Sequence, residues 1–168
     1  MTTTQTNDNP SVYVSTYAKY NNGNLKGAWI DLTKFNDYDD FLAHCRDLHS
    51  DEQDPELMFQ DYENFPHGYY AESGLDSSLW EYINLDDDDR EMLEAYHEAG
   101  FEGDIDDARD AFQGHYESDY EFACEMLEMT GDIQLIPEHL SSYFDYDKFA
   151  RDLMFDYSSS NGFYFSNN

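Results

Sequence analysis

The sequence predicts an α+β fold made of small modules arranged in series. Near the N-terminus, apolar residues alternate with polar ones, which is the period of β-strands, and from about residue 75 they recur at helical spacing. Aromatic residues make up 17% of the 168 residues, and disordered chains are poor in such residues. We therefore expect a folded chain, although 38 acidic and 8 basic residues give it a formal net charge of −30.

Residues 11–66 are predicted to form an N-terminal β-β-α-β domain, preceded by a disordered segment over residues 1–10. An alternating pattern that begins at Ser11 predicts the first strand. The cluster Asn-Asn-Gly-Asn at residues 21–24 predicts a hairpin turn, and the second strand is expected from about residue 25 to 32.

A helix and a third strand complete this domain. Asn36 can cap the helix. The sequence LMFQDY, which begins at Leu57, predicts the third strand. The apolar face of the helix is expected to consist of Tyr38, Phe41, Leu42, Cys45 and Leu48.

Residues 67–116 are predicted to form a central acidic helical domain. We expect one helix in SSLWEYINL, a second over residues 86–99, and a shorter third one that Asp104 opens. Asp86 can cap the start of the second helix, and Gly100 can cap its end. The buried faces are expected to be Leu79, Trp80 and Ile83, then Met92, Leu93 and Tyr96, then Ile105, Ala108 and Phe112.

Residues 117–168 are predicted to form a C-terminal α+β domain, in which helices are followed by a terminal hairpin. Residues Ser118 to Glu121 match a capping box, which predicts the start of a helix, and Gly131 is expected to end this helix. Pro137 is expected at the first position of a short helix. The other expected features are a helix capped by Asp145, a hairpin in MFDYSSSNGFYF, and apolar faces formed by Phe122, Met126 and Met129 and by Phe149, Ala150 and Leu153.

The isolated Cys45 and Cys124 lie within helical patterns, so we expect reduced thiols rather than a disulfide. No apolar run approaches the roughly 18 residues of a membrane span. The N-terminal residues MTTTQTNDNP have neither a basic nor an apolar region. The expectation is a cytoplasmic protein that contacts no membrane.

Catalytic motifs are scarce in the sequence. It contains no glycine-rich phosphate loop, nucleophile elbow, H-E-x-x-H or C-x-x-C. Residues 104–114 resemble a calcium loop only superficially, because Ala108 stands where a third ligand is needed. Glu94 and His97 match one half of a di-iron site, but no second such pair follows. We therefore expect no enzyme, no cofactor and no metal site.

Acidic residues are crowded onto particular helix faces. Residues 84–110 contain twelve acidic residues and two Arg. Carboxylates at i, i+4 spacing repel one another at a cost of roughly 0.2 to 0.5 kcal/mol per pair. Two such rows are predicted, one formed by Asp87, Glu91, Glu94 and Glu98 and one by Glu117, Glu121, Glu125 and Glu128.

These rows are compatible with imitation of a phosphate backbone. Duplex DNA carries one charge per roughly 1.7 Å, so a ceiling of about 65 Å, or roughly 19 base pairs, corresponds to 38 carboxylates. Such a surface would compete with DNA for a basic protein and bind no nucleic acid itself. The predicted mimic surface consists of Asp86, Asp87, Asp88, Asp89, Glu91, Glu94, Glu98, Asp104, Asp106, Asp107, Asp110, Glu117, Asp119, Glu121, Glu125 and Glu128.

The acidity of the chain is also compatible with two different hypotheses. Adaptation to high salt should acidify all exposed surfaces alike, but residues 1–35 carry a net charge of +1 and residues 36–168 a net charge of −31. An acidic chaperone or adaptor for another basic nucleic-acid-binding protein would show the same acidic helices. Both hypotheses stay open at the level of the sequence.

Two segments resemble the recognisable segments of the ArdA antirestriction proteins, which mobile elements use against host restriction. The first is VYVSTYAKYNNGNLKGAW, residues 12–29, with Tyr13, Lys19 and Trp29 among its matching positions. The second is IPEHLSSYFDYDKFARDL, residues 136–153. The second segment fits the family pattern at Pro137, Leu140, Tyr143, Asp145, Tyr146, Arg151, Asp152 and Leu153. The predicted motif and dimer region also includes Phe144.

The resemblance implies an elongated, homodimeric DNA mimic with three small domains that inhibits type I restriction-modification enzymes by occupying the DNA groove of their methyltransferase core. In this family the second segment is the antirestriction motif, and the C-terminal domain that contains it is used for self-association. From the residues themselves, this segment is expected to form a packed helix pair with Lys148 and Arg151 paired to nearby aspartates. Its expected core is Leu140, Tyr143, Phe144, Phe149 and Leu153.

Overall fold

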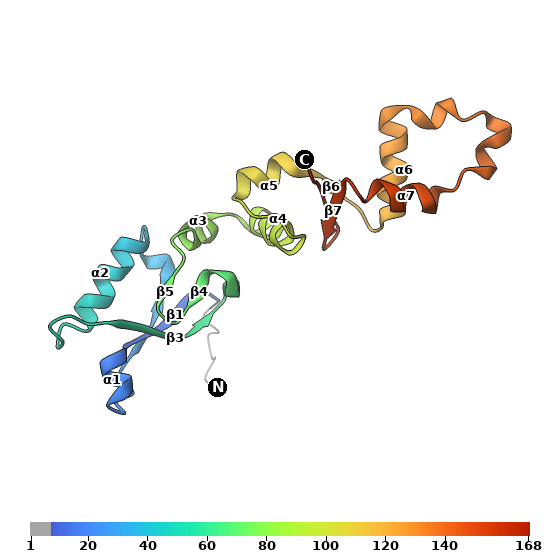
Figure 1. Cartoon of the computed structure of the whole chain (residues 1–168). Coiled ribbons are helices and arrows are strands. Elements are labelled where there is room, and N and C mark those ends of the chain that lie inside the picture. The colour runs from blue at the N-terminus through green and yellow to red at the C-terminus, as the bar shows by residue number, and fades with distance from the viewer. Residues whose placement is uncertain (1–7) are drawn as a thin grey trace, which may run out of the picture. The chain divides into compact units, whose positions relative to one another are not determined.

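The computed structural model describes residues 8–168 of the chain (Figure 1). The chain divides into two compact units, the first ending at Leu85 and the second spanning Asp86–Asn168. Each unit combines helices with small antiparallel sheets, which confirms the predicted α+β class. The disorder expected over residues 1–10 falls mostly on residues 1–7, which lie outside the described residues. The division into three domains stays a prediction.

Three antiparallel strands form the sheet of the first unit, in the order β2-β1-β3. They are β1 (Ser11–Thr16), β2 (Ala28–Asp31) and β3 (Leu57–Glu63). The predicted pairing of the first two strands is confirmed. The prediction of a tight turn between them is wrong. Helix α1 (Tyr17–Asn21) follows β1 directly, because the Thr16 hydroxyl accepts a hydrogen bond from the backbone N–H of Lys19 at 3.2 Å and so caps a helical turn.

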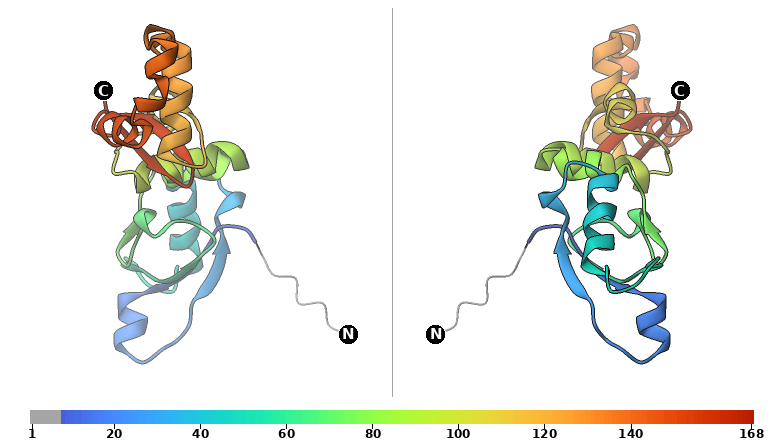
Figure 2. Two further views of the ribbon diagram at one scale, coloured as in Figure 1. Left: turned by 90° about the vertical axis from the view of Figure 1, so that its right-hand side faces the viewer. Right: turned by 90° about the vertical axis from the view of Figure 1, so that its left-hand side faces the viewer.

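Helix α2 (Tyr38–Leu48) packs against this sheet (Figure 2). Its cap is Asp37 rather than the expected Asn36, because the Asp37 carboxylate accepts a hydrogen bond from the backbone N–H of Asp40 at 2.8 Å. Most of the predicted apolar face is buried or half-buried, but Leu48, at its end, is 40% exposed.

An aromatic cluster forms the core of the first unit. The ring of Phe41 in α2 lies 5.9 Å from that of Phe59 in β3 and 5.5 Å from that of Trp80, centroid to centroid. Trp80 belongs to α3 (Leu79–Asn84), whose predicted apolar face is buried. The remaining elements of this unit are η1 (Leu32–Lys34), η2 (His67–Tyr69), β4 (Tyr70–Ala71) and β5 (Gly74–Leu75).

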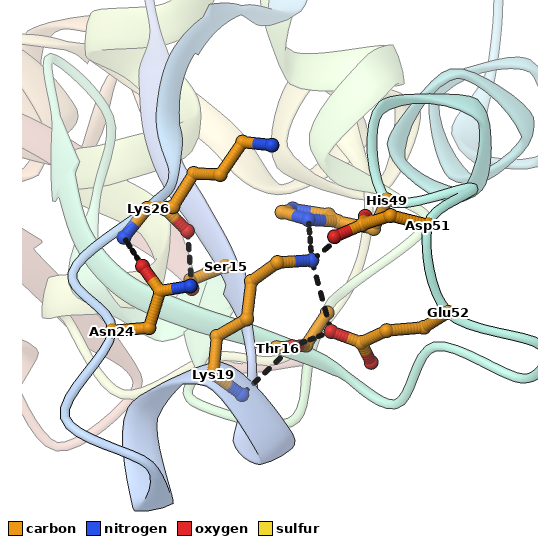
Figure 3. A network of polar contacts seen from close by, with 8 residues as sticks. All are labelled: Ser15, Thr16, Lys19, Asn24, Lys26, His49, Asp51 and Glu52. Atoms are coloured by element: carbon orange, nitrogen blue, oxygen red, sulfur yellow. Dashed lines mark hydrogen bonds and ion pairs between the residues drawn. The ribbon is translucent and has the colours of Figure 1, made fainter.

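A buried lysine joins several segments of the first unit (Figure 3). The side chain of Lys19, on α1, is only 6% exposed. Its ammonium donates hydrogen bonds to His49 Nδ1 at 3.0 Å, Asp51 Oδ1 at 3.0 Å and Glu52 Oε1 at 2.9 Å. The Thr16 hydroxyl donates a further hydrogen bond to Glu52 Oε1 at 2.7 Å. This Lys19 network ties the end of β1 and α1 to the loop that follows α2.

The charge of Lys19 controls the ionisation of the groups around it. Burial by itself lowers the pKa of Lys19, but the hydrogen bonds to Glu52 and Asp51 outweigh burial and leave this pKa raised. The hydrogen bonds from Lys19 lower the pKa of both carboxyl groups. Burial and the Lys19 charge lower the pKa of His49. At neutral pH the network therefore holds one ammonium, two carboxylates and a neutral imidazole.

The second unit is built on a sheet with the strand order β6-β8-β7. The predicted terminal hairpin is confirmed, with Asn161 (φ 49°) and Gly162 (φ 82°) in its turn. Strand β6 was not predicted, and Phe112, expected on a helix, is its first residue. The three strands are β6 (Phe112–His115), β7 (Tyr157–Ser160) and β8 (Phe163–Ser166).

Aromatic residues of β8 point alternately to two groups of helices. The ring of Phe165 lies 5.3 Å from that of Tyr96 on α4 (Asp87–Glu98), centroid to centroid. Tyr164 points the other way, with its ring 4.6 Å from that of Phe122 on α6 (Asp119–Thr130). The sheet therefore lies between α4 and α6, and its strands come from both sides of the expected domain boundary at residue 116.

The predicted helix 86–99 is confirmed as α4. The Asp86 carboxylate caps it by accepting a hydrogen bond from the backbone N–H of Asp89 at 2.9 Å. At the other end Gly100 has a φ of 101°, and the N–H of Phe101 donates to the carbonyl of Tyr96 at 3.2 Å. This arrangement is the glycine-dependent end that the sequence indicated. Helix α5 (Ile105–Ala111) follows and contacts α4.

Helix α6 begins at the expected cap and ends before the expected glycine, Gly131, which has a φ of 77°. The predicted capping box is only half formed. Ser118 accepts a hydrogen bond from the N–H of Glu121, but the Glu121 carboxylate accepts one from the N–H of Glu117 at 2.8 Å rather than from Ser118. Met129 is 70% exposed, whereas Leu127, which was not predicted to be apolar core, is buried.

Short helices complete the second unit. They are η3 (Asp132–Leu135), η4 (Glu138–Tyr143) and α7 (Tyr146–Leu153). Pro137 lies just before η4 rather than at its first position. Asp145 caps α7 as predicted, because its carboxylate accepts a hydrogen bond from the N–H of Lys148 at 2.9 Å.

Both cysteines are free thiols, which confirms that prediction. Cys45 lies in the core of the first unit, and burial raises the pKa of its thiol to about 12. Among residues 8–168, no helix has the length and apolar character needed to cross a membrane.

Replacing Lys19 by methionine is expected to lower the melting temperature at neutral pH by about 5–10 °C, because charged hydrogen bonds to Asp51 and Glu52 are lost. The folded protein lowers the pKa of both carboxyl groups. Their contribution to stability is therefore complete above the ordinary carboxyl pKa and disappears as pH falls through the folded-state pKa. The difference between wild type and variant should thus shrink in acid.

Thermal melts followed by circular dichroism, from neutral pH to about pH 3, measure this difference. Lys26→Met is the matched control, because Lys26 is exposed in the same unit and makes no salt bridge with a described residue. A difference between Lys19→Met and wild type that stays constant over this range would contradict the assignment.

Candidate functional site

The acidic residues are most concentrated in the second unit, where the sequence predicted the mimic surface. Residues 86–168 contain 23 acidic and four basic side chains, a net charge of −19, whereas residues 1–85 contain 15 and four, a net charge of −11. The two units are of similar length. The acidic side chains differ in what they contact, however, and these contacts separate structural carboxylates from free ones.

The acidic first turn of α4 has a structural reason. Asp87, Asp88 and Asp89 occupy the turn where the helix dipole favours negative charge. Asp89 is partly buried and accepts a hydrogen bond from Arg109 Nη2 at 2.6 Å. Arg109 also binds Asp106 through Nη1 at 3.1 Å, so this guanidinium links α4 to α5. The hydrogen bond to Asp89 raises the pKa of Arg109.

Two further carboxylates hold the start of α5. The Asp104 carboxylate accepts hydrogen bonds from the N–H groups of Asp106 and Asp107, at 2.9 and 3.1 Å. The Asp107 carboxylate accepts one in return from the N–H of Asp104 at 3.0 Å, which completes a capping box. Asp110, one turn later, is exposed and has no such role.

The predicted acidic row on α4 is largely exposed. Asp87, Glu91 and Glu98 are exposed and Glu94 is half-buried. Glu98 nevertheless has a structural role, because its Oε2 accepts hydrogen bonds from Ser160 Oγ and Asn161 Nδ2, both at 2.8 Å. These bonds fix the turn of the β7–β8 hairpin to the end of α4.

The second predicted row, on α6, is fully exposed. Acids in the first turn of this helix again have structural contacts. Asp119 accepts a hydrogen bond from the Tyr164 hydroxyl at 2.7 Å, and burial together with this bond raises the pKa of Tyr164 to about 12. Glu121 holds the chain before the helix, as described above. Glu125 and Glu128, further along, have no such contacts.

A subset of the predicted acids thus remains exposed without any structural contact. These side chains make no hydrogen bond or ion pair with any residue that the structure describes. They come from α4, α5 and α6 and the segment just before α6. We call them the free carboxylates: Asp88, Glu91, Asp110, Glu117, Glu125 and Glu128.

The structure adds exposed acids that the prediction missed. None of them belongs to either of the two regular rows, so helical spacing could not reveal them. The segments that carry them are the loop before α5, η3, η4, α7 and the loop before β7. These additional acids are Glu102, Asp132, Glu138, Asp147 and Asp156.

The acids are spread out and do not converge on a point. Within residues 8–168, no group of three or more His, Cys, Asp or Glu side chains could hold a metal ion. Exposed carboxylates without neighbouring cations produce a broad negative potential that attracts positively charged partners and is screened by salt. This arrangement suits the binding of a large basic surface.

The segment 136–153 does not form the expected packed helix pair. Leu140 and Tyr143 are 45% and 82% exposed, so their assignment to a core is wrong within this unit. Neither Lys148 nor Arg151 forms a salt bridge with a residue in the described part of the chain, so that predicted pairing is also wrong. Of the remaining motif residues, the half-buried ones are Phe144 and Tyr146 and the exposed ones are Pro137, Asp145 and Asp152.

Structural and free carboxylates should respond differently to mutation. Asp104→Ala removes the cap of α5 and is expected to destabilise the second unit by about 1 kcal/mol. Asp110→Ala is the matched control, because it removes a free carboxylate from the last turn of the same helix, where the dipole disfavours an anion. Urea unfolding should therefore show a loss for the first variant and no loss for the second. Equal losses would refute the distinction.

Comparison with known proteins agrees with this picture. Residues 12–165 match the model of a protein family described as antirestriction protein (ArdA). No curated protein matches the sequence. The match includes both segments that carried the resemblance, and it covers more than nine-tenths of the 168 residues. The chain therefore belongs to the ArdA family of antirestriction proteins.

Proposed function

We propose that this protein inhibits a type I restriction-modification enzyme by imitating DNA. In this proposal, the acidic surface of the second unit occupies the groove in which the methyltransferase core of that enzyme holds its DNA. The observation that carries the proposal is the set of free carboxylates on α4, α5 and α6. Inhibition then comes from binding alone, without catalysis, and takes place in the cytoplasm, for the benefit of a mobile genetic element.

The physical basis is competition for basic side chains. A protein that grips DNA phosphates with Lys and Arg meets a similar density of negative charge on helices whose carboxylates stand about 5–6 Å apart at Cβ. The structural carboxylates add to this field, because a carboxylate that caps a helix keeps its charge. Binding releases counterions from both partners, as DNA binding does, and is therefore weakened by salt.

We further propose that two copies associate through the exposed apolar surface of the C-terminal part. Exposed apolar side chains are usually scattered singly on monomers, and groups of them mark interaction sites. A homodimer would double the charged length, with a ceiling of about 38 base pairs. In residues 129–155 the large exposed apolar side chains are Met129, Leu135, Leu140, Tyr143 and Phe155.

The first experiment measures displacement of a labelled DNA duplex from a type I methyltransferase core by the purified protein, at low and at moderate salt. The test variant replaces the free carboxylates Asp88, Glu91, Glu125 and Glu128 by their amides. We expect it to displace DNA at least about tenfold more weakly than wild type at low salt, because four charges no longer meet the groove.

The matched control replaces four exposed acids of the first unit, which also make no side-chain hydrogen bond or ion pair with described residues, and so changes the net charge equally. Equal weakening by both variants would contradict a localised mimic surface. Displacement that does not change with salt would contradict mimicry itself, and equally tight binding to an unrelated basic protein would favour an adaptor. The control residues are Asp39, Asp47, Asp54 and Glu63.

The dimer is tested by light scattering after size-exclusion chromatography. Leu135→Glu combined with Tyr143→Glu places charges in the proposed interface and is expected to shift the protein to a monomer. Leu25→Glu is the control, because Leu25 is 81% exposed but belongs to the first unit. A monomeric wild type, or a double variant that stays dimeric, would rule out this interface.

A further inference from the structure

A groove runs along the outer edge of the sheet in the first unit. It has a volume of about 390 Å³ and lies between strand β2 on one side and η1 and α2 on the other. All four residues of β2 line it, so the groove follows the edge of the strand and not one face of the sheet. The lining is Ala28, Trp29, Ile30, Asp31, Lys34, Phe35, His44 and Leu48.

Strand β2 has backbone groups at this edge that pair with no described strand. Among the described strands it pairs only with β1, because it stands at the end of the order β2-β1-β3. The N–H of Leu32 donates to the carbonyl of Pro10 at 2.9 Å, and antiparallel pairing alternates along a strand. Ile30 and Ala28 therefore also direct their N–H and C=O groups towards β1, whereas Trp29 and Asp31 direct theirs outward, into the groove.

Most of the side chains that line the groove are apolar, and Lys34 adds a positive charge. Trp29 and Leu48 remain 46% and 40% exposed there. The Lys34 ammonium makes no salt bridge with any residue in the described part of the chain. The carboxylate of Asp31 is already engaged by the Thr33 hydroxyl at 2.6 Å and the Asn9 amide at 2.9 Å. Lys34 is thus available to a carboxylate from outside.

We propose that this groove binds an extended peptide segment of a partner protein, which adds to the sheet as a further antiparallel or parallel strand beside β2. The outward N–H and C=O groups of Trp29 and Asp31 hold its backbone. An apolar side chain of the peptide lies against Trp29 and Leu48, and a carboxylate binds Lys34. A strand edge that is flanked by a helix and offers backbone groups together with a side-chain groove is suited to recognition by strand addition.

The charged side chains that line the groove select this occupant. The Asp31 carboxylate is already engaged by Thr33 and Asn9, whereas Lys34 makes no salt bridge with a described residue, in a chain whose formal net charge is −30. A basic peptide would be attracted more strongly to the acidic surface elsewhere on the protein. An acidic peptide is attracted to Lys34 in this groove. This site is separate from the free carboxylates, so it does not depend on the proposed DNA mimicry.

The experiment titrates the full-length protein with the synthetic peptide acetyl-Val-Asp-Val-Phe-Val-Asp-amide, followed by calorimetry and by amide chemical shifts. We expect a dissociation constant below about 1 mM, with shifts centred on β2, η1 and α2. The same peptide with both Asp replaced by Lys, and one with Pro in place of the central Val, should bind at least about fivefold more weakly.

The sharpest variant pair is Asp31→Pro and Asp31→Ala. Both remove the carboxylate and its hydrogen bonds, but only proline removes the outward N–H. Asp31 has a φ of −76°, which proline adopts without strain, and its N–H points away from β1, so the fold should tolerate either change. Peptide affinity should fall about five- to tenfold for Asp31→Pro relative to Asp31→Ala.

Lys34→Gln provides a second test that leaves the strand unchanged. It should weaken binding of the acidic peptide but not binding of the lysine-containing peptide, whose charge it no longer repels. Absence of binding by the acidic peptide, or equal affinities of Asp31→Pro and Asp31→Ala, would overturn the proposal. If the protein self-associates and Asp31→Pro abolishes this self-association, the groove binds a second copy of the chain. That result would also overturn the proposal. None of these results affects the displacement of DNA.

Discussion

Mutual repulsion among 38 carboxylates is the constraint on which the rest of this structure depends. Two features offset it. Each unit has a core of stacked and edge-on aromatic rings, centred on Phe41 in the first unit and on Phe165 in the second, and such rings bury large apolar areas. In addition, many acids near α4, α5 and α6 accept hydrogen bonds from helix N-termini or from side chains. These contacts turn part of the charge into a source of stability.

The basic residues of the Lys19 network and of the acidic helices hold parts of the fold together. Lys19 is buried beneath two carboxylates in the first unit, and Arg109 joins two acidic helices in the second. Both neutralise charge where segments must come together. The free carboxylates are left without counter-charges on the surface, and this division of the ions explains how one chain can be both strongly acidic and folded.

Many local features were predictable from the sequence, although the predicted cap at Asn36 and the predicted tight turn at residues 21–24 were wrong. Features that depend on distant partners were missed. Helix caps such as Asp86 and Asp145, and the hairpin turn at residues 161–162, follow from neighbouring residues alone. Strand β6 was missed because its four residues become a strand only by pairing with β8, about fifty positions later. For the same reason the sequence could place acids in rows but could not show that Glu98 binds Ser160.

The distribution of indole rings has a spectroscopic consequence. The chain contains two tryptophans, Trp29 at 46% exposure in the groove and Trp80 at 4% in the aromatic core, and both belong to the first unit. Intrinsic tryptophan emission therefore reports unfolding of the first unit alone, with a solvent-exposed and a buried component. The second unit, which carries the acidic rows, is visible only through its tyrosines. A single emission curve would thus describe half of the molecule, and two units can unfold in separate transitions.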